Sequence, residues 1–338
     1  MATLWFSLLA AMLIVYVVLD GFDLGAGALH LFVARTDDER KRVLRAIGPF
    51  WDGNEVWLLA AGGTMVFAFP RLYAQSFSGF FLPLMVVLWL LMGRGIAIEF
   101  RGHLENDVWR TFWDTIFAVS SALLCVFFGA ALGNVVRGVP LEGGTFFEPF
   151  FTDFRPTGYT GILDWYTTLV GVFALSALSL HGARWLVLKT DGALAERARR
   201  AGTVLFAVSL VLVAAISIVT FRVQPWIGER LKAQPLGLAF PVAGFAAFLA
   251  SAFLARKGRD AAAFAASSLF LAGLLAATAF GLFPHLLPSS LVGGEGLTIH
   301  NAAAPASGLR TALFWWIPGM ALVSGYTVFV YRHFAGKS

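Results

Sequence analysis

Long apolar runs constrain the fold of this chain more than any other feature of its sequence. The blocks 77–92, 204–221 and 261–283 contain no charged residue at all. About 20 helical residues cross a hydrocarbon core of roughly 30 Å, and backbone polar groups in lipid must be hydrogen-bonded within the protein. Alternating strands of about ten residues, which a membrane β-barrel needs, are absent. The blocks therefore predict transmembrane helices.

The composition agrees with a membrane protein. Hydrophobic residues make up 58% of the chain and charged residues 13%, with a mean hydropathy of +0.76, whereas soluble domains carry about 25% charged residues. The basic residues that give the net charge of +5 lie mostly between the apolar blocks. This placement favours contact with lipid headgroups over nucleic acid. The single cysteine, Cys125, excludes an intrachain disulfide and a thiolate metal cluster. A basic stretch and a cleavage site are missing near Met1, so we expect the first span to be retained.

The apolar pattern predicts an all-α integral membrane protein that forms a single polytopic domain over residues 1–338. We expect about nine transmembrane helices, at 3–33, 53–69, 75–98, 112–136, 160–187, 201–222, 236–255, 261–283 and 310–332. Short connections between them favour two antiparallel four-helix bundles and a peripheral ninth helix.

The distribution of basic residues predicts the orientation. With the N-terminus outside, 18 of the 25 lysines and arginines fall on cytoplasmic segments and 7 on external ones. Because cytoplasmic loops are enriched in lysine and arginine, we expect an external N-terminus and a cytoplasmic C-terminus.

Charged residues within or beside the spans are the candidate functional groups, because ionisable residues in a membrane are costly. They are Asp20, Asp23, Asp52, Glu55, Arg94, Glu99 and Arg101. Asp20 and Asp23 stand three positions apart, which places them on one helical face. Asp52 and Glu55 repeat this spacing at the start of the second span. All seven are expected near the cytoplasmic ends of the first three spans.

Two interpretations of this group stay open. Several carboxyl groups near arginines in a partly dry setting can relay protons. Asp52 can instead be the N-cap of its helix, with Glu55 as the partner in a capping box. In that case the charges serve packing and helix capping.

Histidines and tryptophans give weaker signals. Among the six histidines, His30 and His181 lie near or within spans and form the only conceivable pair of axial haem ligands; packing roles are the alternative. Most tryptophans near span ends fit an interfacial aromatic belt. Trp51 and Trp57 flank the acidic group and could line a pocket for an apolar ligand.

Several stretches resemble subunit II of cytochrome bd-type quinol oxidases. They are Asp20-Gly-Phe-Asp-Leu-Gly-Ala-Gly, Trp51-Asp-Gly-Asn-Glu-Val-Trp-Leu, Phe69-Pro-x-x-Tyr-x-x-x-Phe-Ser-Gly-Phe, Gly93-Arg-Gly-Ile-Ala-Ile-Glu-Phe-Arg, Phe283-Pro-x-x-x-Pro-Ser-Ser and Leu297-Thr-Ile-His-Asn-Ala. The resemblance covers nearly the whole chain, although residues 140–260 carry little of it.

The resemblance implies a complex in the bacterial inner (plasma) membrane. Its haem-bearing subunit I would hold two b-type haems and one d-type haem, and small single-span accessory subunits accompany some members. The complex would oxidise quinol, reduce O₂ to water and take protons from the cytoplasm, which builds a proton-motive force. Subunit II would bind no haem of its own and would be catalytic only within the heterodimer.

The resemblance also implies roles for particular residues. Asp52 matches a family acid on a proton-uptake route, and Arg94, Glu99 and Arg101 match charged positions beside it. Glu99 is an aspartate in some relatives.

Trp57 matches a position linked to O₂ access, and Trp51 lies where a structural quinone has been proposed. Two other functions remain open: a secondary transporter whose site uses Asp20, Asp23 and Arg94, and a haem-b membrane anchor that uses His181.

Overall fold

The computed structural model describes residues 1–141, 145–156, 158–291 and 293–337. Its helices are α1 (Ala2–Val33), α2 (Asp37–Ile47), α3 (Trp51–Ala68), α4 (Pro70–Gly79), α5 (Phe81–Phe100), α6 (Asp107–Arg137), α7 (Trp165–Lys189), α8 (Gly192–Val223), α9 (Pro225–Ala233), η1 (Pro235–Leu238), α10 (Ala239–Arg256), α11 (Asp260–Leu282) and α12 (Ala306–His333). Two short antiparallel strands, β1 (His285–Leu287) and β2 (Leu297–Thr298), pair with each other.

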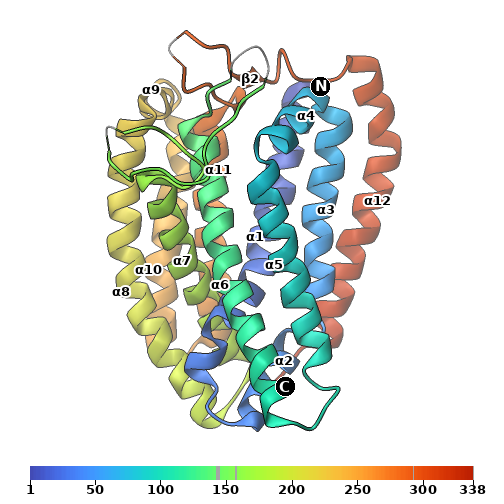
Figure 1. Ribbon diagram of the computed structural model, residues 1–338, viewed down its shortest axis with the longest axis vertical. Coiled ribbons are helices and arrows are strands. Elements are labelled where there is room, and N and C mark those ends of the chain that lie inside the picture. Colours follow the sequence, from blue (N-terminus) through green and yellow to red (C-terminus); the bar gives the residue numbers. More distant parts are fainter. Residues whose placement is uncertain (142–144, 157, 292, 338) are drawn as a thin grey trace.

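Most of the helices run side by side along the long axis of the molecule (Figure 1). Among the described residues, eight helices are long and apolar enough to cross a membrane, and α3 with α4 is a ninth candidate whose two parts are bent by 118°. The N-terminus lies at one end of the bundle, here called the upper end, and the C-terminus at the lower end (Figure 1). The predicted all-α membrane fold is confirmed.

The long helices pack in two groups of four, as predicted. In the first bundle, α1 contacts α3 and α6, and α5 contacts α6; in the second, α7 contacts α8 and α11, and α10 contacts α11. The two bundles meet mainly where α1 and α6 contact α7, and α12 lies against α3 outside the first bundle. Every functional candidate in the first three spans therefore belongs to the first bundle.

The contact of α1 with α7 depends on two glycines. A Cβ atom at Gly25 would overlap the Leu178 carbonyl, and one at Gly182 would overlap the backbone of Gly25 and Ala26. Small residues at such crossings let two transmembrane backbones approach closely. The two bundles can therefore meet backbone to backbone.

Several boundaries differ from the predicted spans. The largest difference is at α8, which begins at Gly192 rather than at residue 201, and α6 begins at Asp107 rather than at residue 112. The third span was expected to begin at residue 75, but residues 70–79 form α4, and α5 begins at Phe81. Pro70 starts α4, and the preceding Phe69 has a non-helical backbone (φ −136°, ψ 64°), because proline keeps the residue before it out of the helical region. The fifth predicted span, which is α7, begins at Trp165 rather than at residue 160. The reason is that the Asp164 side chain accepts hydrogen bonds from the backbone N–H groups of Tyr166 and Thr167.

The short helix α2 occupies the connection at the lower end of the first bundle. Thr36 and Glu39 form its capping box, and Val43, Ala46 and Ile47 are its buried residues. An amphipathic helix of this kind buries one side and leaves charges on the other. It fixes where α3 starts, and hence where the polar start of α3 lies relative to α1.

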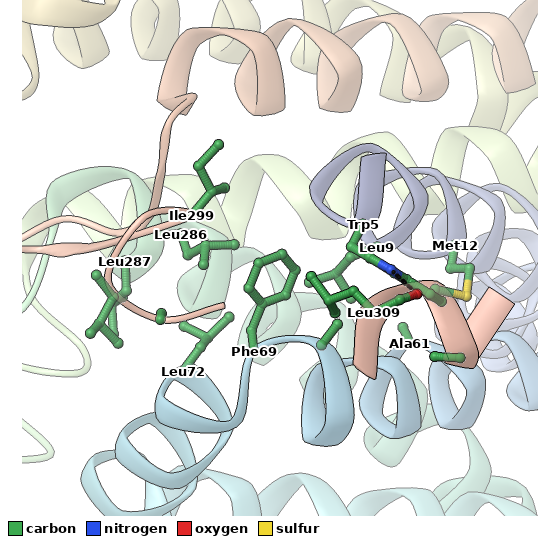
Figure 2. Close-up of a cluster of buried hydrophobic side chains, with 14 of the residues drawn as sticks. Trp5, Leu9, Met12, Ala61, Phe69, Leu72, Leu286, Leu287, Ile299 and Leu309 are labelled. Carbon is green, nitrogen blue, oxygen red and sulfur yellow. Dashed lines mark hydrogen bonds between the residues drawn. The ribbon is translucent and has the colours of Figure 1, made fainter. Parts of the chain in front are cut away.

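An apolar cluster closes the upper end (Figure 2). The Trp5 Nε1–H of α1 donates to the Leu309 carbonyl of α12 over 3.1 Å, which satisfies the one polar group of a fully buried ring. Phe69 and Leu72 pack near them in the same cluster, together with residues of the strand segment such as Leu286 (Figure 2). The cluster joins the N-terminal parts of α1 and α12 to the bend between α3 and α4.

Candidate functional site

A buried ion pair inside the first bundle joins α1 to α5. Asp20 and Arg94 are both fully buried. The Arg94 guanidinium donates two hydrogen bonds to the Asp20 carboxylate, at 2.6 and 3.0 Å. Such a bidentate pair is geometrically specific and stronger than a neutral hydrogen bond. It fixes the Arg94 guanidinium, with its charge matched by Asp20, between two long apolar helices.

The Asp23 carboxyl group, one turn further along α1, is only partly satisfied. Asp23 has no exposed surface, and its Oδ2 accepts a 2.7 Å hydrogen bond from the Asn54 side-chain amide of α3. Asn54 in turn accepts from the Tyr331 hydroxyl of α12 over 3.1 Å. The Asp23 Oδ1 atom has no hydrogen-bond partner among the described residues. A buried carboxyl oxygen without a partner is costly to charge.

Glu55 connects this buried group to the surface. Its carboxylate oxygen lies 3.7 Å from the Arg94 guanidinium, and its side chain is 25% exposed. Asp52 lies on the exposed surface one turn earlier in α3 and interacts electrostatically with Glu55. The acids therefore form a gradient of burial from Asp52, through Glu55, to Asp23.

The capping interpretation of Asp52 and Glu55 is wrong. α3 begins at Trp51, its N-cap is Phe50, and no side chain caps it. The Asn54 N–H donates to the Phe50 carbonyl, so the helix starts two residues earlier than a cap at Asp52 would require. Asp52 lies within the first turn instead.

Two of the predicted site residues lie outside this cluster. Glu99 is exposed at the end of α5. The Arg101 guanidinium belongs to a second network, in which it donates to Asp114 of α6 over 2.5 Å and to Asp37 of α2 over 2.8 Å. His30 joins Asp114 over 2.7 Å. The hydrogen bonds from Lys41 and Arg101 lower the pKa of Asp37 to about 2, so this second network is held as an ion pair.

The two tryptophans have different surroundings. Trp57 is 8% exposed, and its ring N–H donates to the Thr327 hydroxyl of α12 over 3.4 Å. Trp51 is partly exposed and its ring lies against Gly95 of α5. Trp57 thus belongs to the contact between α3 and α12, whereas Trp51 stands at the rim of the charge cluster.

His181 does not offer a nitrogen to a haem iron. Its Nδ1 lies 2.7 Å from the Ser267 hydroxyl and its Nε2 lies 3.0 Å from the Val18 carbonyl. The ring also stacks on Phe264. With both nitrogens in hydrogen bonds, this residue is better described as a packing histidine, and the His30–His181 haem pair has no support from the geometry.

A transporter site is not supported either. Such sites use helices broken beside the bound substrate. The break here follows Ala68, at the upper end of α3, whereas Glu55 and Asn54 lie near its lower end (Figure 1). The buried charges sit on continuous helical segments.

The sequence missed several residues of the two networks. Asn54 lies between Asp52 and Glu55 in the same motif, so it could have been identified from the sequence. Tyr331 is 277 positions from Asn54, and no local pattern announces that contact. Asp114 lies within a long apolar helix, and an acid in a membrane span is a candidate functional residue for that reason alone. It could therefore have been identified from the sequence.

Comparison with known proteins places the chain in a family. The family model described as cytochrome bd terminal oxidase subunit II matches residues 1–334. The chain is 31% identical to the probable cytochrome oxidase subunit 2 of Haemophilus influenzae, with 99% of this chain and 94% of that protein covered. It is 28% identical to cytochrome bd-I ubiquinol oxidase subunit 2 of Escherichia coli, with the same coverage, and 30% identical to cytochrome bd ubiquinol oxidase subunit 2 of Bacillus subtilis, with 98% and 95% covered.

The fold has a counterpart among solved structures. A chain of the bd oxidase of Geobacillus thermodenitrificans superposes with a TM-score of 0.75 at 18% identity, and 98% of each chain is covered. At this identity the likeness concerns the arrangement of helices.

Proposed function

This chain belongs to the cytochrome bd terminal oxidase subunit II family, and from that premise we propose that its buried acids deliver protons to the oxidase. The protein is a subunit of a terminal quinol oxidase complex, and its membership of the family implies a partner, subunit I. In the proposal, subunit I carries the two b-type haems and the d-type haem, and oxidises the quinol. The present chain supports it in the bacterial plasma membrane.

The observation that carries the proposal is the buried Asp23 carboxyl group with one unpartnered oxygen. Reduction of O₂ to water consumes protons, and a relay inside a membrane needs groups that take up and release them. A carboxyl whose two oxygens are both fixed by an arginine, as in Asp20, is a poor relay. Asp23 keeps one oxygen free for a proton.

Charge balance supports the same role. Asp20, Asp23 and Glu55 surround the single guanidinium of Arg94. One arginine neutralises one carboxylate, and further unpaired charge is costly in a dry site. In the proposal, the carboxyl groups of Asp23 and Glu55 therefore bind and exchange protons. The fixed Asp20–Arg94 ion pair lies beside them and does not take part in the exchange.

The proposed route begins at the exposed Asp52, passes Glu55 and reaches Asp23. Its order follows the gradient of burial. Glu99 is exposed at the end of α5, and Arg101 belongs to the separate Asp114 network. Both match charged family positions, and we assign them a supporting role.

Trp57 and Trp51 are proposed to shape an apolar path for O₂ or a pocket for a structural quinone. Trp57 is held by Thr327 and has little room to move, which suits a fixed wall. Trp51 has an exposed edge beside the charge cluster, which suits contact with a ligand or with subunit I.

The relay is tested by Asp23→Asn, which keeps the size of the side chain and removes its titratable group. In the purified complex of both subunits, we expect normal haem content and a quinol oxidase turnover lowered about 100-fold, within the range that proton-transfer groups contribute. Asp38→Asn is the matched control, because Asp38 is an exposed acid of α2 that pairs with Arg42. Near-normal turnover of Asp23→Asn would refute the relay, and loss of assembly would assign Asp23 a structural role.

A further inference from the structure

A cavity of about 310 Å³ lies in the second bundle, away from the charge cluster of the first. Arg184 of α7, Arg199 and Phe206 of α8, and Arg256 of α10 line it. These residues stand where α7 and α10 end and α8 begins, which is the lower end of the bundle (Figure 1). The charge distribution predicts that this end faces the cytoplasm.

Arg184 is the unusual member of the lining. The residue is 5% exposed, and its Nε atom is buried without a hydrogen-bond partner. Within the part of the chain that the structure describes, its guanidinium has neither a hydrogen bond nor an ion pair. A buried charge without a partner is unfavourable, so an anion bound in the cavity would stabilise this guanidinium.

The nearest acid cannot supply that anion. Asp260 of α11 interacts electrostatically with Arg184, but its two carboxylate oxygens accept hydrogen bonds of 2.9 and 3.1 Å from Arg199. The Asp260 charge is therefore matched by Arg199. Arg184 and the exposed Arg256 leave the cavity with an excess of positive charge.

The walls of the cavity point to the source of the anion. Phe206 and Ala252 form its apolar part, and Phe206 stacks on Phe248 with ring centroids 4.5 Å apart. Along their length, α8 and α10 also expose apolar side chains such as Val211 and Leu249. A cationic cavity lined in part by apolar side chains, on helices that expose further apolar side chains, matches a phosphate group that carries hydrocarbon chains.

We propose that this cavity binds a phosphate group, supplied by the headgroup of an anionic phospholipid. Arginine suits this chemistry because its planar guanidinium donates two parallel hydrogen bonds to phosphate oxygens. Arg184 holds the phosphate from inside, and Arg256 contacts it from the exposed rim. The bound lipid joins α7, α8 and α10 at the lower end of the second bundle.

The test uses the complex of both subunits, purified in detergent and depleted of lipid. Phosphatidylglycerol, phosphatidylcholine or inorganic phosphate is added at equal concentration, and bound lipid is counted by native mass spectrometry while thermal unfolding is followed in parallel. We expect the wild-type complex to retain one phosphatidylglycerol molecule. The Arg184→Gln complex should retain about 10-fold less of this lipid, because it lacks one charge-assisted hydrogen-bonding group.

Arg200→Gln is the matched control, because Arg200 is an exposed arginine of the same helix end that pairs with Glu196 outside the cavity. Its lipid retention should equal that of wild type. Arg256→Gln, a rim substitution that spares the interior, should also lower retention and replaces Arg184→Gln if that variant does not assemble.

Two results would overturn the proposal. Equal retention of phosphatidylglycerol by wild type and by both cavity variants would show that the lipid does not bind in this cavity. Stabilisation by inorganic phosphate alone, dependent on Arg184, would leave an anion site but exclude the lipid as its source. Turnover does not enter the measurement, so failure here leaves the proton relay untouched.

Discussion

Asp52 and Asp23 have opposite surroundings although both are acids of the first bundle. Asp52 lies in the open at the start of α3, and Asp23 is fully buried on α1. A surface carboxylate collects protons that water or a buffer can also deliver, whereas a buried carboxyl has no substitute. The same substitution should therefore have different consequences at the two positions.

We predict that Asp52→Asn lowers quinol oxidase turnover of the assembled complex about 10-fold, or about 1.4 kcal/mol of barrier. High concentrations of a small weak-acid buffer should restore most of the rate, because such an acid can donate at an exposed position. The Asp23→Asn complex should not respond to the buffer. Turnover of Asp52→Asn that is normal without added buffer would show that proton uptake does not use this residue.

The sequence predicted the members of the buried cluster better than their partners. Asp20, Asp23, Glu55 and Arg94 were identified because charge in an apolar span is rare. Their pairing was not predictable, since Arg94 could equally have faced Asp23, and Arg101 was wrongly grouped with them. Which atoms meet depends on the rotation of each helix, and a single sequence carries no measure of that rotation.

At the scale of elements, the glycine contact between α1 and α7 is the most demanding feature. Gly25 and Gly182 let the two helices touch through their backbones. A methyl group at either position would push the helices apart across the junction of the bundles. Overpacking of a well-packed core costs about 1–3 kcal/mol or more.

We predict that Gly25→Ala lowers the melting temperature and the yield of the complex, with the loss in stability at the upper part of that range. Gly325→Ala in α12 is the control, because a Cβ atom there would meet nothing within 4 Å. The measurement is thermal unfolding of the detergent-solubilised complex. Equal melting curves for the two variants would show that the close approach of α1 and α7 is dispensable.

Helix positions were predictable from hydrophobicity, and the short elements were not. The apolar runs located every long helix, although α8 begins nine residues before its predicted span, whereas α2, α4 and α9 fell in segments expected to be connections or parts of spans. Local signals existed for two of them: the capping box of Thr36 and Glu39, and Pro70 at the start of α4. Short amphipathic helices beside a membrane are easily hidden by the stronger signal of the spans.

At the scale of the whole molecule, the two termini lie at opposite ends of the helical bundle (Figure 1). An odd number of crossings has this consequence, and nine candidates arise when α3 and α4 count as one span. Which end faces the cytoplasm rests on the excess of lysine and arginine in the connections at the lower end.

We predict that a reporter fused after Tyr159 is external and one fused after Gly192 is cytoplasmic. Alkaline phosphatase, which is active only outside the cytoplasm, should report activity at the first position and none at the second. Tyr159 lies in the connection before α7 and Gly192 is the first residue of α8, so the spans that precede each fusion stay intact. The reverse pattern would invert the proposed direction of proton uptake from Asp52 to Asp23.

The Asp20–Arg94 pair also sets a condition on how the protein is made. The two residues are 74 positions apart, which a ribosome translates in about 4 to 15 s. For that interval the first span carries an acid whose cation has not yet been synthesised, and a lone carboxylate in hydrocarbon is costly. The nascent first span must therefore enter the bilayer with Asp20 protonated, or stay at the insertion machinery until the helix that carries Arg94 emerges.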